Sequence, residues 1–195
     1  MVHIEGVLDW NTLEQRVRET TLLEQRNDES VYPYENANIQ LKRINYRDVA
    51  PTSLYVLRKN LARQAEIALA LHDEGYHPLE LSAGLLIGGI DGSIQGLVPP
   101  IVEETEAEGQ YVLDGAHRTY EGYLDNTRDS FMAIHISDIR ADTPGYALPN
   151  RWDKIKELDA VPDDPAKKKH YREGYRGLYR NFGPLNGSRI REAGS

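Results

Sequence analysis

Five consecutive residues, 114–118 with the sequence Asp-Gly-Ala-His-Arg, place a carboxylate, an imidazole and a guanidinium where an apolar strand is expected to turn into a helix. At such a helix start the backbone N–H groups of Gly115, Ala116 and His117 have no helical partner, and they can point at a phosphate with help from the helix dipole. The planar guanidinium of Arg118 can add a forked, charge-assisted contact to the same anion. The motif therefore predicts an anion-binding turn.

Each charged residue of this turn also has a structural interpretation. Asp114 either caps the helix by accepting a hydrogen bond from one of its first amides, or binds Mg²⁺ or orients an attacking hydroxyl. His117 is either a structural histidine or a phosphate contact, and its neighbours at a helix start favour the phosphate contact. Arg118 either binds polyphosphate or forms a surface ion pair with Glu121 or Asp125, which would stabilise the fold little.

Other motifs in the chain are better explained by structure than by chemistry. The glycines of residues 88–92 are not followed by Gly-Lys-Ser/Thr, so they predict a hairpin rather than a phosphate loop. Residues 72–77 hold two histidines and two acids at a spacing that fits no strong zinc signature, which favours solvated surface. His135 lies in an apolar strand and is expected in the core or at its rim, whereas Trp152 either walls a small-molecule pocket or packs.

Hydrophobic periodicity predicts the elements that position this turn. An amphipathic helix over residues 13–23 precedes a half-buried strand at 39–44 and a strongly patterned helix that starts at Pro51 and ends before Gly75. The predicted order then continues with a hairpin at 85–96 that turns at Asp91-Gly92, a strand at 98–102, an acidic loop at 103–108, a strand at 110–113, a helix to residue 124 and a strand at 131–136.

The composition is that of a globular protein without thiol chemistry. The chain has 195 residues, of which 39% are hydrophobic, with no cysteine and no apolar run of membrane-spanning length, so we expect a cytoplasmic protein. Its net charge of −8 disfavours nucleic acid as a partner, because binding to phosphate backbones requires a basic surface. Residues 166–195 nevertheless carry eight basic and two acidic side chains, so the charge is uneven. The sequence leaves the oligomeric state open, and a homodimer is compatible with it.

The basic C-terminal stretch carries tyrosines and arginines at steps of four, which on a helix would form two adjacent stripes. In one interpretation the tyrosines pack on the main domain while the arginines stay solvated. In the other, the segment is a lid whose arginines reach a nucleotide or an acidic substrate. The two stripes are Tyr171, Tyr175 and Tyr179, and Arg172, Arg176 and Arg180.

The stretch from residue 39 to 139 resembles the ParB/sulfiredoxin-like superfamily. The resemblance rests on the Asp-Gly-x-His-Arg turn, on the strand at 111–113 that enters it, and on the sequence Pro-Pro-Ile-Val at 99–102. It implies an α+β fold, with a ParB/sulfiredoxin-like mixed sheet flanked by helices and with N-terminal and C-terminal helical extensions. The implied division is an N-terminal extension at 1–37, the core at 38–140, and a looped, basic C-terminal extension at 141–195.

The superfamily contains three chemistries that the sequence partly separates. Sulfiredoxins use a catalytic cysteine between the glycine and the histidine of the turn, where this chain has Ala116, so that route of sulfinic-acid reduction is excluded. ParB partition proteins bind CTP and read DNA through downstream helices, which the Pro-rich stretch after residue 139 does not predict. Free-serine kinases phosphorylate a small amino acid and need neither feature, so the turn is closest to that branch.

The resemblance to this branch implies a magnesium-dependent transferase that phosphorylates the hydroxyl of a small metabolite such as free serine. Residues 115–118 would bind the phosphates of ATP or ADP, with CTP as a further choice, while Asp114 and His117 would be catalytic and Asp114 would also bind Mg²⁺. Those kinases have an acidic residue just after the first strand that resembles a base, and here Asp48 is the nearest acid, at a different spacing. The alternative is a non-catalytic CTP- or ATP-binding regulator, related to ParB, of a DNA or protein partner.

Overall fold

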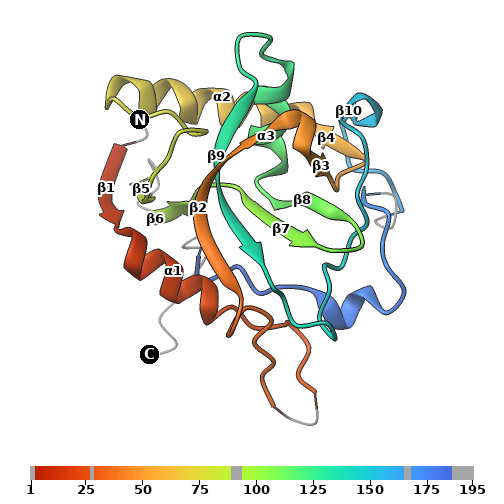
Figure 1. Ribbon diagram of the computed structural model, residues 1–195. Helices are drawn as coiled ribbons and strands as arrows, with labels where there is room; N and C mark the ends of the chain where they lie inside the picture. The colour runs from red at the N-terminus through yellow and green to blue at the C-terminus, as the bar shows by residue number, and fades with distance from the viewer. Residues whose placement is uncertain (1–2, 27–28, 89–93, 165–167, 186–195) are drawn as a thin grey trace, which may run out of the picture.

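A mixed five-stranded sheet forms the centre of the molecule, as the computed structural model of residues 3–26, 29–88, 94–164 and 168–185 shows (Figure 1). Antiparallel and parallel pairs alternate across it: β2 with β9 antiparallel, β9 with β7 parallel, β7 with β8 antiparallel, and β8 with β3 parallel. In spatial order the strands are β2 (Asn38–Asn45), β9 (Ser130–Ser137), β7 (Ile101–Thr105), β8 (Gly109–Asp114) and β3 (Val49–Pro51).

Two smaller sheets and three α-helices surround this sheet in the described part of the chain. The N-terminal strand β1 (His3–Leu8) pairs antiparallel with β5 (Gly84–Gly88), which pairs in turn with β6 (Ile94–Leu97). A parallel pair joins β4 (Tyr55–Leu57) to β10 (Lys156–Leu158). The helices are α1 (Trp10–Arg18), α2 (Arg58–Asp73) and α3 (Ala116–Leu124), and the 3-10 helices include η1 (Tyr46–Asp48), η2 (Trp152–Lys154) and η4 (Tyr175–Leu178).

Both faces of the central sheet are buried, because alternate strand residues pack into different clusters. On β8, Val112 packs with residues of α3 and the neighbouring strands, whereas Tyr111 and Leu113 pack with the C-terminal segment. The cluster around α1 contains Leu13 and Val17, which pack on the ends of β7 and β9. Figure 1 shows α2 and α3 above the sheet, with α1 and the C-terminal segment below it.

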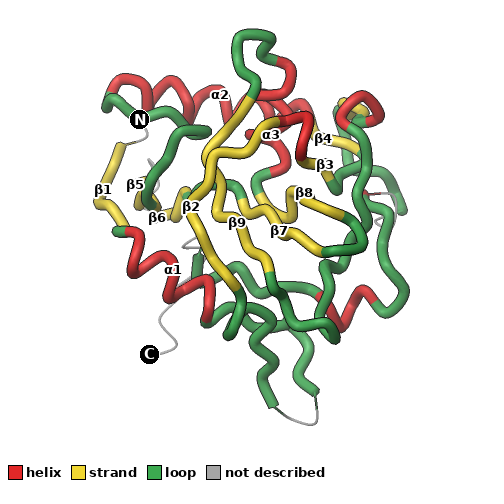
Figure 2. Tube along the Cα trace, in the orientation of Figure 1, coloured by secondary structure: helices red, strands yellow, loops and turns green. Residues whose placement is uncertain are grey.

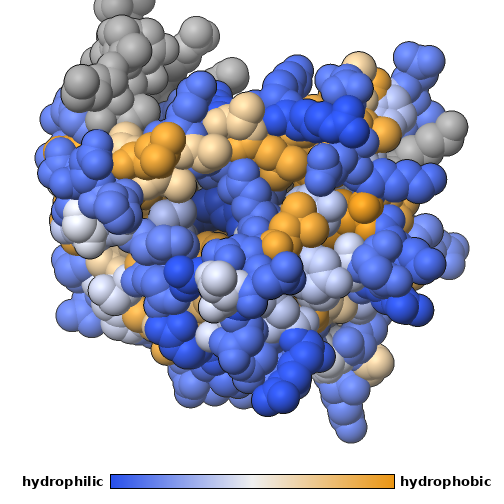
Figure 3. Space-filling model, turned by 90° about the horizontal axis from the view of Figure 1, so that it is seen from above, coloured by the Kyte–Doolittle hydropathy of each residue, from blue (hydrophilic) through white to orange (hydrophobic). Residues whose placement is uncertain are grey.

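Seen from above, the surface alternates between hydrophilic residues and small apolar groups, and it is hollowed near the centre (Figure 3). None of the helices in the described ranges combines the length and apolar character that crossing a membrane requires.

A charged group in the lower face of the sheet needs a partner, and the C-terminal segment provides it. Glu103 of β7 and Arg180 form an ion pair with 3.0 Å between Nη2 and Oε1, and both side chains are 0% exposed. The hydroxyls of Tyr34 and Tyr111 donate to the same carboxylate. Burial, and then the charge of Glu103, raise the pKa of Tyr34 well above its ordinary value, so its hydroxyl stays a donor. Four distant chain segments therefore meet at one buried carboxylate.

The sequence correctly predicted the α+β class and most elements of the core. The strands predicted at 39–44, 110–113 and 131–136 are β2, β8 and β9, and the helix that follows the Asp-Gly turn is α3. The predicted hairpin is the β5–β6 pair, but its expected turn at Asp91-Gly92 lies outside the described residues. The acidic loop was wrong at its start, because residues 103 and 104 belong to β7 and pair with β8.

Two helix predictions need correction. The helix expected from Pro51 begins only at Arg58, because Pro51 belongs to β3 beside β8, where a proline loses nothing at an edge. The N-terminal helix ends at Arg18, and β1, which was not predicted, precedes it. Leu22 lies beyond the helix in an isolated bridge with Arg180, so this segment contacts the C-terminal extension.

The expected helical C-terminal extension is also wrong for its described part, which consists mostly of loops (Figure 2). Gly174, at φ +67°, turns the chain between Tyr171 and Tyr175, and only the short 3-10 helix η4 follows. The three tyrosines pack on one another and on the sheet, so aromatic docking replaces helix formation. The arginines do not all stay solvated, since Arg180 is buried and Arg172 pairs with Glu108.

We predict that Arg180→Met lowers the free energy of unfolding by about 3–5 kcal/mol, because it leaves the Glu103 carboxylate buried without its cation. The matched control is Arg151→Met, which removes an exposed pair with Asp153 and should cost less than about 1 kcal/mol. Urea unfolding of both variants at pH 7 measures the difference. Equal losses in the two variants would contradict the structural role assigned to the buried pair.

Candidate functional site

The Asp-Gly-Ala-His-Arg turn lies where β8 ends and α3 begins, and its glycine is required by geometry. Gly115 has φ +87°, in the left-handed region that side chains disfavour. A Cβ at this position would lie 3.0 Å from the Cβ of Pro100 and 3.3 Å from Nη2 of Arg118. The backbone at the start of α3 is therefore open on the side where a ligand would approach, and packed against the Pro-Pro segment on the other.

Two helix starts meet at His117. Neither α2 nor α3 has a side-chain cap at its N-terminus, and neither has an acidic residue in its first turn. The Nε2 atom of His117 lies 3.4 Å from the backbone nitrogen of Leu57, which precedes α2, and 3.4 Å from Nδ2 of Asn60. The positive ends of both helix dipoles therefore point to the same place, without the acidic residues that usually offset them.

The carboxylate of Asp114 has no hydrogen bond or ion pair within the described ranges, although it is only half-exposed. It does not cap α3, because Gly115 occupies the N-cap position and turns the chain away. The capping interpretation of Asp114 is therefore wrong. What remains is a carboxylate at the end of β8 that acts on the pKa of His117, Arg118 and Lys169 through its charge alone.

His117 is held as a neutral imidazole. Burial, and then the positive charge of Lys168, lower its pKa, while Asp114 opposes the shift. If Nε2 accepts from the amide of Leu57, the proton of the neutral ring lies on Nδ1. That N–H is then a hydrogen-bond donor at the edge of the turn.

Arg118 is buried rather than exposed, so the surface ion pair with Glu121 or Asp125 is wrong. Its Nη1 donates to the backbone oxygen of Val98 at 2.8 Å, and lies 3.5 Å from the oxygen of Pro78. One edge of the guanidinium thus ties α3 to two loops. The Nη2 atom has no hydrogen-bond partner among the described residues and lies beside Gly115, so the predicted phosphate contact is restricted to this edge.

Sequence reasoning missed two further residues of the site, Lys169 and Thr52. The Nζ atom of Lys169 donates to Oγ1 of Thr52 at 2.6 Å, and Thr52 donates in turn to the backbone oxygen of Val112 on β8. Burial, and then the charge of Lys168, lower the pKa of Lys169 to about 8, against the attraction of Asp114. The basic run at 167–169 was visible in the sequence, but no spacing rule connects it to a turn 50 residues earlier.

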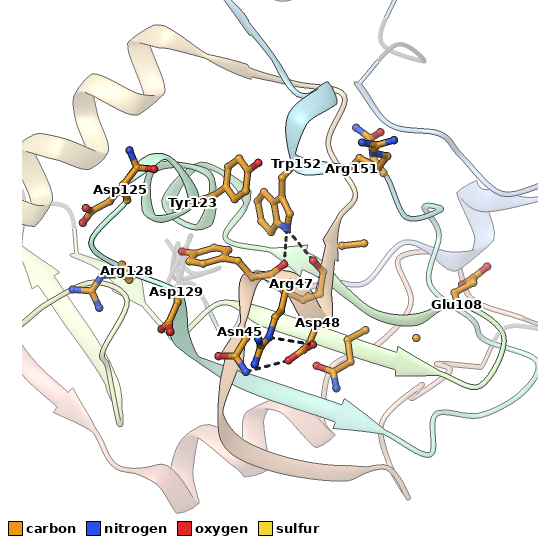
Figure 4. A pocket seen from close by; sticks show the side chains of 17 residues that line it. Asn45, Arg47, Asp48, Glu108, Tyr123, Asp125, Arg128, Asp129, Arg151 and Trp152 are labelled. Atoms are coloured by element: carbon orange, nitrogen blue, oxygen red, sulfur yellow. Dashed lines mark hydrogen bonds and ion pairs between the residues drawn. The ribbon is translucent and has the colours of Figure 1, made fainter.

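The remaining candidates lie elsewhere. Asp48 and Trp152 line a cavity of about 780 Å³ that reaches the first residues of β8, at the opposite end of that strand from Asp114 (Figure 4). Asp48 is thus not placed to act as a base at the turn. The indole of Trp152 donates to the backbone oxygens of Tyr46 and Val49, so it both packs and walls this cavity. His135 is buried and its Nε2 lies 2.6 Å from Oε2 of Glu104.

The histidines and acids of residues 72–77 are exposed, as expected. Nowhere in the described ranges do three or more histidine, aspartate or glutamate side chains gather into a group that could hold a metal ion.

A mixed sheet with an Asp-Gly turn into a helix defines an α+β domain of the ParB-like class. The chain matches the family model described as the ParB CE domain over residues 12–156, and it therefore belongs to that family. No curated protein and no solved structure matches the chain. The matched range includes the turn at 114–118 but ends before Lys169, and it does not distinguish the kinase branch from other members.

We predict that Gly115→Ala lowers the free energy of unfolding by roughly 2–3 kcal/mol. A positive φ costs an alanine about 1–2 kcal/mol, and crowding against Pro100 adds to it. Gly109→Ala is a matched control, since Gly109 also has a positive φ, of +69°, but nothing lies within 4 Å of its Cβ position. Urea unfolding should show the smaller loss for Gly109→Ala. Identical losses would mean that the approach to Pro100 is not tight.

The buried ammonium of Lys169 predicts a pH effect on stability. Its pKa of about 8 in the folded state lies below the ordinary 10.5, so the unfolded chain binds more protons between these values and folding becomes more favourable as pH rises. From pH 7 to pH 9.5, the free energy of unfolding of the wild type should rise by roughly 2 kcal/mol relative to Lys169→Met. Urea unfolding at both pH values tests this, and a constant difference would contradict the lowered pKa.

Proposed function

We propose that this protein is a nucleotide-dependent phosphotransferase that transfers a phosphoryl group from ATP or ADP to the hydroxyl of a small metabolite, an amino acid such as serine being the implied acceptor. The observation that carries the proposal is the meeting of two uncapped helix starts at His117, beside the unpartnered carboxylate of Asp114. CTP is a further candidate donor, because the turn holds phosphates rather than a base.

The phosphate-binding part of the proposal follows from the backbone. The first amides of α3 have no helical acceptor and no side-chain cap, and the dipole of α2 adds to their positive field. The Nδ1–H of a neutral His117 and the Nη2 edge of Arg118 offer further donors on the same side of the turn. These donors fit a group with several anionic oxygens better than a single carboxylate.

The residues of the turn also fit Mg²⁺. This ion is commonly bound through one or two carboxylates together with the phosphate oxygens of the nucleotide, and Asp114 is a carboxylate with no competing partner among the described residues. When bound, Mg²⁺ would neutralise phosphate charge, which is the main requirement of phosphoryl transfer. Asp114 itself would bind the ion or orient the acceptor hydroxyl, and the amides of residues 115–117 would hold the phosphates.

A non-catalytic regulator that binds CTP or ATP is the second candidate. It is favoured by the absence, within the ranges that the structure describes, of any group of three or more metal-ligating side chains. Such a protein would use the same phosphate contacts without transferring the phosphoryl group, and its partner would recognise the bound state.

Phosphorus NMR of the protein with Mg²⁺, either ATP or ADP, and a pool of amino acids tests the proposal. We expect a new phosphomonoester signal, which Asp114→Asn should slow by about 10²–10³ because a charge at the reacting groups is lost. Asp153→Asn is the control, because Asp153 is an exposed carboxylate paired with Arg151 and should leave the rate unchanged.

Two results would count against the kinase. Saturable nucleotide binding without any phosphomonoester would favour the regulator. A protein that binds none of the three nucleotides by calorimetry would contradict both candidates, because both depend on phosphate contacts at the turn.

A further inference from the structure

A short C-terminal segment, residues 168–172, lies as a strap across the site. Ser53 forms an antiparallel bridge with Lys169, and Ala147 forms another with Tyr171. The amide of Leu54 donates to the oxygen of Lys168 at 2.9 Å, and the amide of Leu148 donates to the oxygen of His170 at 2.8 Å. The strap is therefore held on both edges by main-chain hydrogen bonds, which place its side chains accurately.

Within the strap, Lys169 points inward. The residue is 7% exposed, whereas Lys168 and His170 on either side are exposed. Its ammonium donates to Thr52 and lies 5.2 Å from the ring centre of Tyr146. No carboxylate lies within 4 Å of Nζ in the described part of the chain, and the remaining N–H groups of the ammonium have no recorded acceptor there.

A buried ammonium without a carboxylate partner is costly, because removal of a charge from water is repaid only by close opposite charge. The charges around Lys169 do not repay it: Lys168 of the strap repels it, and Asp114 at the end of β8 attracts it from beyond ion-pair distance. His117 of α3 is neutral, and the hydroxyl of Tyr146 stays protonated because burial, and then Asp114, raise its pKa. The arrangement therefore lacks one negative charge.

We propose that Lys169 is a ligand-binding residue, whose ammonium binds an anionic oxygen of the molecule held at the turn. This inference rests on the proposed function for the location of the ligand, and adds a contact from outside the family-matched range of 12–156. The anionic oxygen belongs either to the phosphate chain of the nucleotide or to the carboxylate of an amino-acid acceptor. Thr52 keeps the ammonium directed, since its hydroxyl accepts from Lys169 while donating to β8.

The experiment uses the full chain with the variant Lys169→Met, which keeps the length of the side chain and removes its charge. Calorimetry with inorganic pyrophosphate and with ATP, and steady-state kinetics with serine as acceptor, separate the two sources. Weakening of pyrophosphate and ATP binding by at least tenfold assigns the contact to phosphate. Unchanged binding with a serine KM raised at least tenfold assigns it to the acceptor carboxylate. Lys154→Met is the control, an exposed lysine beside Asp153.

A second variant, Thr52→Val, keeps the lysine but removes its hydrogen-bond acceptor, and should weaken the same step by a smaller factor. Melting curves without ligand show that both variants are folded. If Lys169→Met changes every one of these quantities by less than twofold, the inference is overturned while the proposed function stands. If the wild type binds pyrophosphate through Lys169 but neither binds nor turns over nucleotide, the proposed function fails and the inference survives. If the wild type binds no probe, both are overturned.

Discussion

The buried ion pair between Glu103 and Arg180 is the interaction on which the rest of the structure depends. A sheet that is buried on both faces must place some alternate residues under the second cover, and Glu103 of β7 is one of them. The carboxylate can stay there only because a guanidinium and two tyrosine hydroxyls surround it. Arg180 in turn donates to backbone oxygens of Thr143 and Leu178, so the pair also orders the loops around it.

This dependence couples the lower face of the sheet to the candidate site. The segment that ends in Arg180 contains the strap at 168–172, which docks beside Asp114 and His117. Between them, Arg172 donates to Glu108 and to the oxygen of Gly145, and Tyr146 and Tyr179 pack with their ring centres 4.7 Å apart. The electrostatics of the turn thus depend on a segment that is anchored on the other side of the sheet.

The turn itself divides its tasks between backbone and side chains. Gly115 lets α3 start against Pro100, and the uncapped amides then face the open side. Arg118 uses one edge to tie α3 to the loops at Pro78 and Val98, which is a structural task, and leaves only its other edge for a ligand. His117 links α3 to the start of α2. Anion binding and fold stability therefore rely on the same few atoms, and this is why Asp114, which has no structural partner, stands out as the group free for chemistry.

The sequence by itself determined the α+β class, the core strands and the turn, because local periodicity and the conformational demand of Gly115 act over a few residues. It also placed Asp114 and His117 at a helix start. It could not show that Pro51 joins a strand, that Arg118 is buried, or that the C-terminal tyrosines pack instead of forming a helix. Only the tertiary structure decided these, and with them the position of Lys169 beside Thr52, because pairing between segments more than 100 residues apart is governed by burial and charge balance, which leave no local pattern.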